Sequence, residues 1–115
     1  MYALFLILNQ IDKLDEIRDI LYELGLGSTT IDSIGMGKVL LKHDIDSTIL
    51  TSLRNILNED KPYNKTLISV INDKEVLDKA VEKISIILDI DNKKAAGFLF
   101  VLPVLYSVGG YSDKD

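Results

Sequence analysis

Two short segments contain the residue types that could bind a ligand. Gly35-Met36-Gly37-Lys38 places a lysine directly after two closely spaced glycines, at the end of a segment rich in β-branched residues. From spacing alone, these four residues are either a turn that contacts a ligand or a bulge that bends a long strand. Phe98 either stacks on the planar ring of a ligand or packs in the core where a strand begins. Both alternatives stay open at this point.

The remaining reactive side chains do not form a catalytic or metal-binding pattern. His43 is the only histidine and there is no cysteine, so a conventional zinc site is not expected and His43 is assigned a capping or solvent-exposed role. Four acidic residues fall on one predicted helix: Asp12, Asp15, Glu16 and Asp19. Acidic residues on the outer face of a helix are usually solvated rather than paired for acid–base catalysis. The sequence therefore predicts no metal site and no enzyme activity.

Length and composition describe one folded domain over residues 1–115. Hydrophobic residues make up 47% of the chain and charged residues 27%, which is enough apolar surface to offset the entropy lost on folding. A net charge of −5 and a pI near 4.8 would repel a polyanion, so no nucleic-acid partner is expected. The apolar run at residues 2–8 is far shorter than the roughly 20 residues that span a bilayer. Because the start also lacks the basic residues of a signal peptide, we expect a cytoplasmic protein without membrane insertion.

Periodicity predicts four strands and three helices. The strands are expected at residues 2–8, 29–34 with a continuation at 39–41 after a bend, 66–71 and 98–105. Apolar residues at helical spacing predict helices between residues 11 and 24, 45 and 57, and 76 and 88. Gly25 is placed to end the first helix, and Asn72 with Glu75 can form a capping box for the third. Pro103 places the last strand at a sheet edge.

This order of elements predicts an α+β fold. Strand, helix, strand, strand, helix, strand is the βαββαβ arrangement of ferredoxin-like domains, in which two helices cover one face of an antiparallel sheet. The 45–57 helix is an extra element in the connection between the second and third strands. Strands 2–8 and 98–105 are apolar on both sides, although a solvated face should alternate polar residues. The second face must therefore be covered, by subunit association or by the 45–57 helix.

Three stretches of the sequence are similar to one known family. They are residues 11–17 (IDKLDEI), 29–38 (TTIDSIGMGK) and 96–104 (AGFLFVLPV). They resemble the PII nitrogen-regulatory signalling family, and the predicted order of elements agrees with that family throughout. The resemblance covers nearly the whole chain apart from residues 38–64. It implies a homotrimer whose sheets face one another.

The resemblance also implies a ligand site in the cleft between subunits. In the family, this site is formed by the base of the long T-loop and by the B-loop before the last strand. The residues that it assigns here are Thr29, Gly35, Met36, Gly37, Lys38, Ala95, Ala96, Gly97 and Phe98. A small-molecule effector and a regulated protein partner follow from the same resemblance.

The sequence departs from the family where phosphate would bind. The B-loop pattern Gly-Asp-Gly-Lys is replaced by Ala95-Ala96-Gly97-Phe98, and the Arg-x-Arg near the family's C-terminus by Val108-Gly109-Gly110-Tyr111. Each cation paired with a phosphate contributes about 1.5 to 3 kcal/mol to binding. Adenine nucleotide is therefore expected only as a weak ligand. We predict that ATP binds at least about ten times more weakly than to a typical PII protein, or not at all.

Two functions from different classes remain open. The chain is a PII-like signal-transduction protein that changes a partner's activity when a small ligand enters the cleft, or it is a ligand-free scaffold with the PII fold. A relative of the CutA copper-tolerance family, which shares the trimeric architecture, is a weaker third interpretation. The absence of cysteine and the single histidine count against metal handling.

Overall fold

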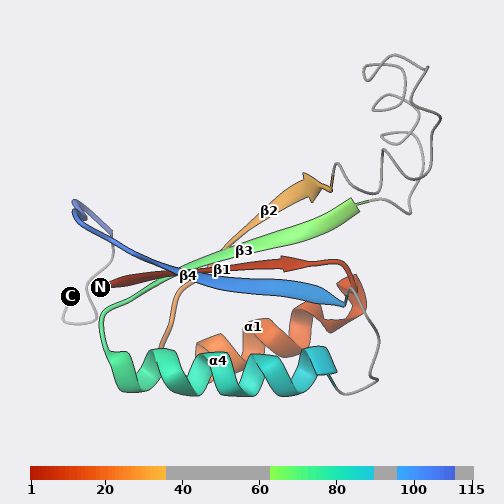
Figure 1. Cartoon of the computed structure of the whole chain (residues 1–115), viewed down its shortest axis with the longest axis horizontal. Coiled ribbons are helices and arrows are strands. Elements are labelled where there is room, and N and C mark those ends of the chain that lie inside the picture. Colours follow the sequence, from red (N-terminus) through yellow and green to blue (C-terminus); the bar gives the residue numbers. More distant parts are fainter. Residues whose placement is uncertain (36–62, 90–95, 111–115) are drawn as a thin grey trace, which may run out of the picture.

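Strands and helices follow one another along the chain as β1, α1, β2, β3, α4 and β4 (Figure 1). The computed structural model describes residues 1–35, 63–89 and 96–110. Its strands are β1 (Tyr2–Leu8), β2 (Thr29–Ile34), β3 (Tyr63–Ile71) and β4 (Gly97–Pro103). A 3-10 turn (Ile11–Lys13) leads into helix α1 (Leu14–Glu23), and helix α4 spans Lys74–Asp89. β1 has the predicted bounds, whereas β3 begins earlier than expected and β4 ends earlier.

The four strands of the described residues form one antiparallel sheet in the order β2-β3-β1-β4. Both helices lie against the same face of this sheet (Figure 1). The arrangement confirms the predicted α+β class with two helices on one face, and it is compatible with a ferredoxin-like fold. β1 lies inside the sheet, as its uninterrupted apolar sequence predicts, and β4 is an edge strand, as Pro103 predicts.

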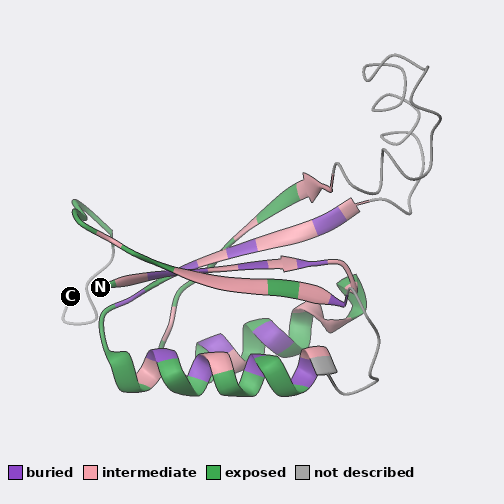
Figure 2. Ribbon diagram, viewed as in Figure 1, coloured by how far each residue is buried: buried purple, intermediate pink, exposed green. Residues whose placement is uncertain are grey.

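The hydrophobic core lies between the sheet and the two helices. Side chains alternate across a strand, so Leu4, Leu6 and Leu8 of β1 all point toward the helices, and all three are fully buried. The rest of the core cluster comes from α1, β3 and α4: Ile17, Leu21, Leu67, Ile71, Leu77, Ala80, Ile84 and Ile87. Buried positions on both helices face the sheet (Figure 2). This core therefore uses only one face of the sheet.

Helix α1 ends at a glycine, as predicted. Gly25 has a φ of +75°, a conformation that side-chain-bearing residues rarely adopt. The N–H of Leu26 donates to the carbonyl of Leu21 at 2.8 Å, and the N–H of Gly25 donates to the carbonyl of Tyr22 at 2.9 Å. These two bonds satisfy carbonyl groups that the helix itself leaves without partners.

The cap of helix α4 differs from the predicted one by a single residue. The N–H of Leu77 donates to the carbonyl of Asp73 at 3.0 Å, so Asp73 rather than Asn72 is the N-cap. The carboxylate of Asp73 accepts a hydrogen bond from the N–H of Glu75 at 2.9 Å. A negatively charged cap at a helix N-terminus is favourable because of the helix dipole. The expected reciprocal pairing of Asn72 and Glu75 is therefore wrong.

Two predicted elements lie outside the described residues: the strand continuation at 39–41 and the helix at 45–57. No described helix has the length and apolar character needed to cross a membrane.

Candidate functional site

The sheet face that is turned away from the helices is apolar. Directly paired residues of antiparallel strands point to the same side, so the register places Phe5 with Ile68 and Phe100 on this face. We call it the open face, and its apolar members are Ala3, Phe5, Ile7, Ile31, Ile68, Val70, Phe98, Phe100 and Leu102.

Several members of the open face are exposed in a single chain. Phe98 is 63% exposed although its ring packs against that of Phe100, with the two centroids 5.4 Å apart. Ile31, Val70 and Leu102 are exposed as well. The apolar second face that the sequence predicts is therefore present, and within the described part of the chain these four side chains remain open to solvent.

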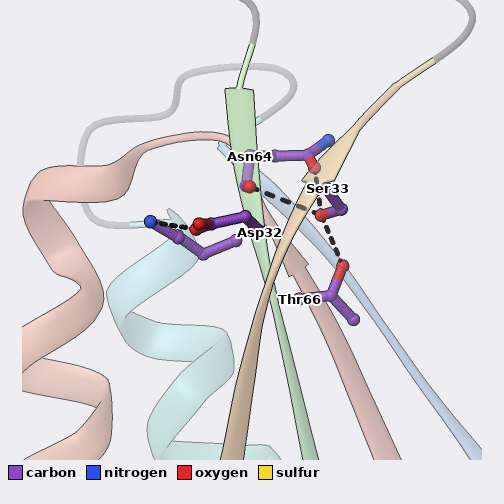
Figure 3. Close-up of polar contacts among 5 residues, drawn as sticks. Asp32, Ser33, Asn64 and Thr66 are labelled. Atoms are coloured by element: carbon purple, nitrogen blue, oxygen red, sulfur yellow. Dashed lines mark hydrogen bonds and ion pairs between the residues drawn. The ribbon is translucent and has the colours of Figure 1, made fainter.

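Polar side chains gather at one end of the open face, which we call the polar end: Asn9, Ser33, Asn64 and Thr66. The hydroxyl of Ser33 lies between the side chains of Asn64 and Thr66 (Figure 3). It donates to Oδ1 of Asn64 and lies 2.7 Å from the Thr66 hydroxyl. Since a serine hydroxyl has one proton, the Thr66 hydroxyl must donate to Ser33.

The polar end joins β2 and β3 to Asn9, the residue that follows β1, by one hydrogen-bonded chain. Asn64 is buried, and its Nδ2 donates to Oδ1 of Asn9 at 3.3 Å. The chain of donors thus runs from Thr66 through Ser33 and Asn64 to Asn9. Such a chain satisfies the buried amide of Asn64, which would otherwise be costly. All four side chains are uncharged, and so are the apolar members of the open face.

Charged side chains of the same strands point to the opposite side. Asp32, the neighbour of Ser33 in β2, forms an ion pair with Lys65 on the helix side of the sheet (Figure 3). The alternation of β2 and β3 therefore keeps charge away from the open face. The partners of Ser33 are an amide and a hydroxyl, which cannot take its proton at neutral pH. The polar end can bind by hydrogen bonding, and it offers Ser33 no base.

The first group of predicted site residues lies at edge strand β2. Thr29 begins the strand and is paired with Ile68, on the open face. Gly35 follows the strand, where an added Cβ would lie 3.4 Å from Nδ2 of Asn64. Gly35 therefore sits directly beside the polar end. Met36, Gly37 and Lys38 lie outside the described residues.

The second group lies at edge strand β4. The carbonyl of Ala96 accepts hydrogen bonds from the N–H groups of Asn9 and Gln10, both at 3.0 Å. At Gly97 an added Cβ would lie 2.9 Å from Cδ2 of Leu88 and 3.2 Å from the carbonyl oxygen of Ile7. A side chain here would displace Leu88 and crowd the backbone of β1, so packing alone favours a glycine at this position. Ala95 lies outside the described residues.

Within a single chain, Gly35 and Gly97 lie apart. Both lie at the same end of the sheet, but β2 and β4 are its opposite edges, with β3 and β1 between them (Figure 1). Neighbouring strands are about 4.8 Å apart, so the two edges are separated by about 14 Å. Gly35 and Gly97 cannot both touch a small ligand within one copy.

A shallow hollow of about 420 Å³ lies on the helix side of the sheet, and none of the described site residues lines it. It is lined by Tyr2, Lys74, Leu77, Asp78, Val81, Val101, Leu102 and Pro103. On its rim, Lys74 forms an ion pair with Asp78 at 2.6 Å, and this hydrogen bond raises the pKa of Lys74. Because both side chains are largely exposed, the pair is an ordinary surface interaction between adjacent helical turns.

Metal binding finds no support in the described part of the chain, where no three His, Asp or Glu side chains are grouped around one point.

Sequence reasoning did not single out the polar end. The predicted third strand begins at residue 66, whereas the structure includes Asn64 in β3 with a buried side chain. Ser33 and Asn64 are paired across β2 and β3 but are 31 positions apart in the sequence. The alternation Ile31-x-Ser33 and Asn64-x-Thr66 is the signal that could have shown one polar end on an apolar face.

The sequence matches no protein-family model and no curated protein. Any function assigned to the chain must therefore rest on its own residues, its fold and the motif resemblance.

Proposed function

We propose that this chain is a homotrimeric, PII-like regulatory protein that senses a small ligand in the cleft between subunits and changes the activity of a protein partner. The observation that carries the proposal is the open face. Leaving large apolar side chains in water forgoes about 1.5 to 3 kcal/mol apiece, and a second and third copy of the chain are the cover that the motif resemblance implies.

The positions of the two loops support a ligand site between subunits. Gly35 and Gly97 lie at opposite edges of one sheet, so one copy cannot bring them to a common ligand. In a ring of copies, the β2 edge of one subunit comes next to the β4 edge of the next. The loop after β2 and the loop before β4 then meet, and Phe98 offers a ring face beside them.

The charges of the site favour a ligand with few phosphates. The polar end and the open face are neutral, and the B-loop lysine and C-terminal arginines of the family are missing. Neutral amides and hydroxyls bind polar, weakly charged groups well, whereas a triphosphate needs several cations to replace its water. ATP is therefore expected to bind weakly.

A ligand-free scaffold is the alternative. It is favoured by the polar end itself, because Ser33, Asn64 and Thr66 already satisfy one another. In that case the polar end serves only to hold β2, β3 and the end of β1 together.

A thermal-shift screen followed by calorimetry tests the proposal. Adenine nucleotides and related metabolites are added to the wild-type chain, and a ligand that raises Tm is titrated into the wild type and into Phe5→Asp, which is designed to separate the subunits. We expect binding to the wild type and at least about tenfold weaker binding to the variant. Equal binding to both would place the site within one chain and contradict the cleft.

Mg-ATP is titrated in the same experiment. We expect no heat, or an affinity well below that of a typical PII protein. Low-micromolar affinity that Lys38→Ala abolishes would contradict the expected loss of phosphate binding. If no compound binds, the scaffold is the better account.

A further inference from the structure

Residues 104–108 follow β4 as an apolar arm with the sequence Val-Leu-Tyr-Ser-Val. Leu105, Tyr106 and Val108 are 86%, 90% and 99% exposed. The N–H of Val104 donates to the carbonyl of Met1 at 3.1 Å, which fixes the start of the arm beside the start of β1. Val104 is half-buried, and residues 105–108 are exposed.

Exposure on this scale indicates an interaction surface. Single exposed apolar residues are common, but three on one short segment, next to an exposed apolar sheet face, exceed what a monomer usually presents. The arm is also rich in residues that favour extended structure. It ends at Gly109 and Gly110, whose φ angles of +85° and +97° suit a change of chain direction.

We infer that the arm of each copy packs across the open face of a neighbouring copy, against Val70 and Leu102. These two residues flank Ala3 in one row, at the end of the open face opposite the polar end. Both are exposed in a single chain. The inference rests on the proposed homo-oligomer and names the segment that joins its subunits.

Charge favours a second copy of this chain as the partner of the arm. The chain has a net charge of −5, so two copies repel each other wherever their charged surfaces meet. The arm and the open face contain no charged residue, so they are surfaces on which two copies can approach without that repulsion. Each copy also supplies one arm and one face, so the two surfaces are matched in number.

The arm does not cover its own open face. If the arm folded back onto its own sheet, the side chains of the arm would be buried, and so would Val70 and Leu102. All of them are exposed in the structure. The arm leaves the sheet at the end where the N-terminus lies (Figure 1). A contact between the arm of one copy and the face of the next is head-to-tail, and such contacts close into rings when the rotation between copies allows it.

Engineered cysteines test the contact directly, because the natural chain has none. The double variant Val70→Cys/Tyr106→Cys is oxidised and its products are separated by mass under denaturing conditions. We expect covalent dimers and larger products. The matched control is Val70→Cys/Tyr22→Cys, since Tyr22 is 82% exposed on the outer surface of α1. Absence of covalent oligomers in the first variant, or equal amounts in the control, would overturn the inference.

The masses of two single variants separate this inference from the proposed oligomer. Tyr106→Asp should weaken self-association at least about tenfold and leave the circular dichroism spectrum unchanged, whereas Tyr22→Asp should change neither. If dilution dissociates the wild type and Tyr106→Asp at the same concentration, the arm contact is wrong and the oligomer stands. If the wild type is a monomer, the arm contact and the proposed oligomer are both wrong.

Discussion

The rings of Phe5 and Phe100 stack across β1 and β4, with their centroids 5.1 Å apart and their planes 2° apart. Phe5 is on the open face, while its neighbour Leu6 is fully buried against the helices. These two adjacent residues of β1 therefore lie on opposite faces of the sheet. Substitutions at these two positions separate the core of a single chain from the surface that we assign to subunit contact.

Leu6→Asp should disrupt the folding of a single chain, whereas Phe5→Asp should disrupt subunit association. A carboxylate at Leu6 would be buried without a partner, and truncation alone at such a site costs about 2 to 5 kcal/mol, so we expect an unfolded or insoluble chain. Phe5→Asp should stay folded by circular dichroism, with a stability loss of about 2 kcal/mol from the lost ring contacts, and should have a smaller mass in light scattering. A Phe5→Asp variant that keeps the wild-type mass would show that the open face is not the subunit interface.

Gly97→Ala should destabilise the fold through close packing of β4. The added methyl group would lie 2.9 Å from Cδ2 of Leu88 and 3.2 Å from the carbonyl oxygen of Ile7, so the Leu88 side chain must move and the β1 backbone is crowded. We expect a loss of about 1 to 3 kcal/mol in urea unfolding. Gly27→Ala is the matched control, because nothing lies within 4 Å of its added Cβ, and it should change stability by less than about 0.5 kcal/mol. Equal effects at both positions would contradict the packing at Gly97.

Ser33→Ala should remove the central link of the polar end. Buried Asn64 then loses the donor to its Oδ1, and an unsatisfied buried acceptor costs about 1 to 3 kcal/mol. Asp32→Asn, one residue away, breaks only the ion pair with Lys65 at the surface and should cost less than about 1 kcal/mol. Chemical denaturation measures the free energy of unfolding of both variants and of the wild type. A Ser33→Ala variant as stable as the wild type would show that water replaces the serine hydroxyl without loss.

The sequence predicts most of the fold because its signals are local. The uninterrupted apolar run of β1, the helical spacing of Ile17 and Leu21, and Gly25 at the end of α1 each depend on residues close together in the chain. The apolar second face could also be predicted, since both faces of β1 and β4 are apolar. What could not be predicted depends on contacts between distant residues. Ser33 meets Asn64 only through the register of β2 and β3.

The cap of α4 shows a different limit. Asn72 and Asp73 are adjacent and both are good N-cap residues, so composition cannot choose between them. The choice depends on which carbonyl accepts the first helical hydrogen bond, and in the structure that is Asp73. For the candidate site, the sequence proposes Gly35 and Gly97 but could not show their separation on opposite edges of the sheet, which decides whether one copy can bring them together.

The mass of the wild-type chain in solution decides whether the open face joins subunits. Multi-angle light scattering is measured across micromolar concentrations at moderate salt, so that repulsion between acidic copies is screened. We predict a particle of three copies, each of 12.9 kDa, whose mass does not depend on concentration in this range. A particle of one copy, 12.9 kDa, at every concentration would contradict subunit association through the open face, and with it the ligand cleft between subunits.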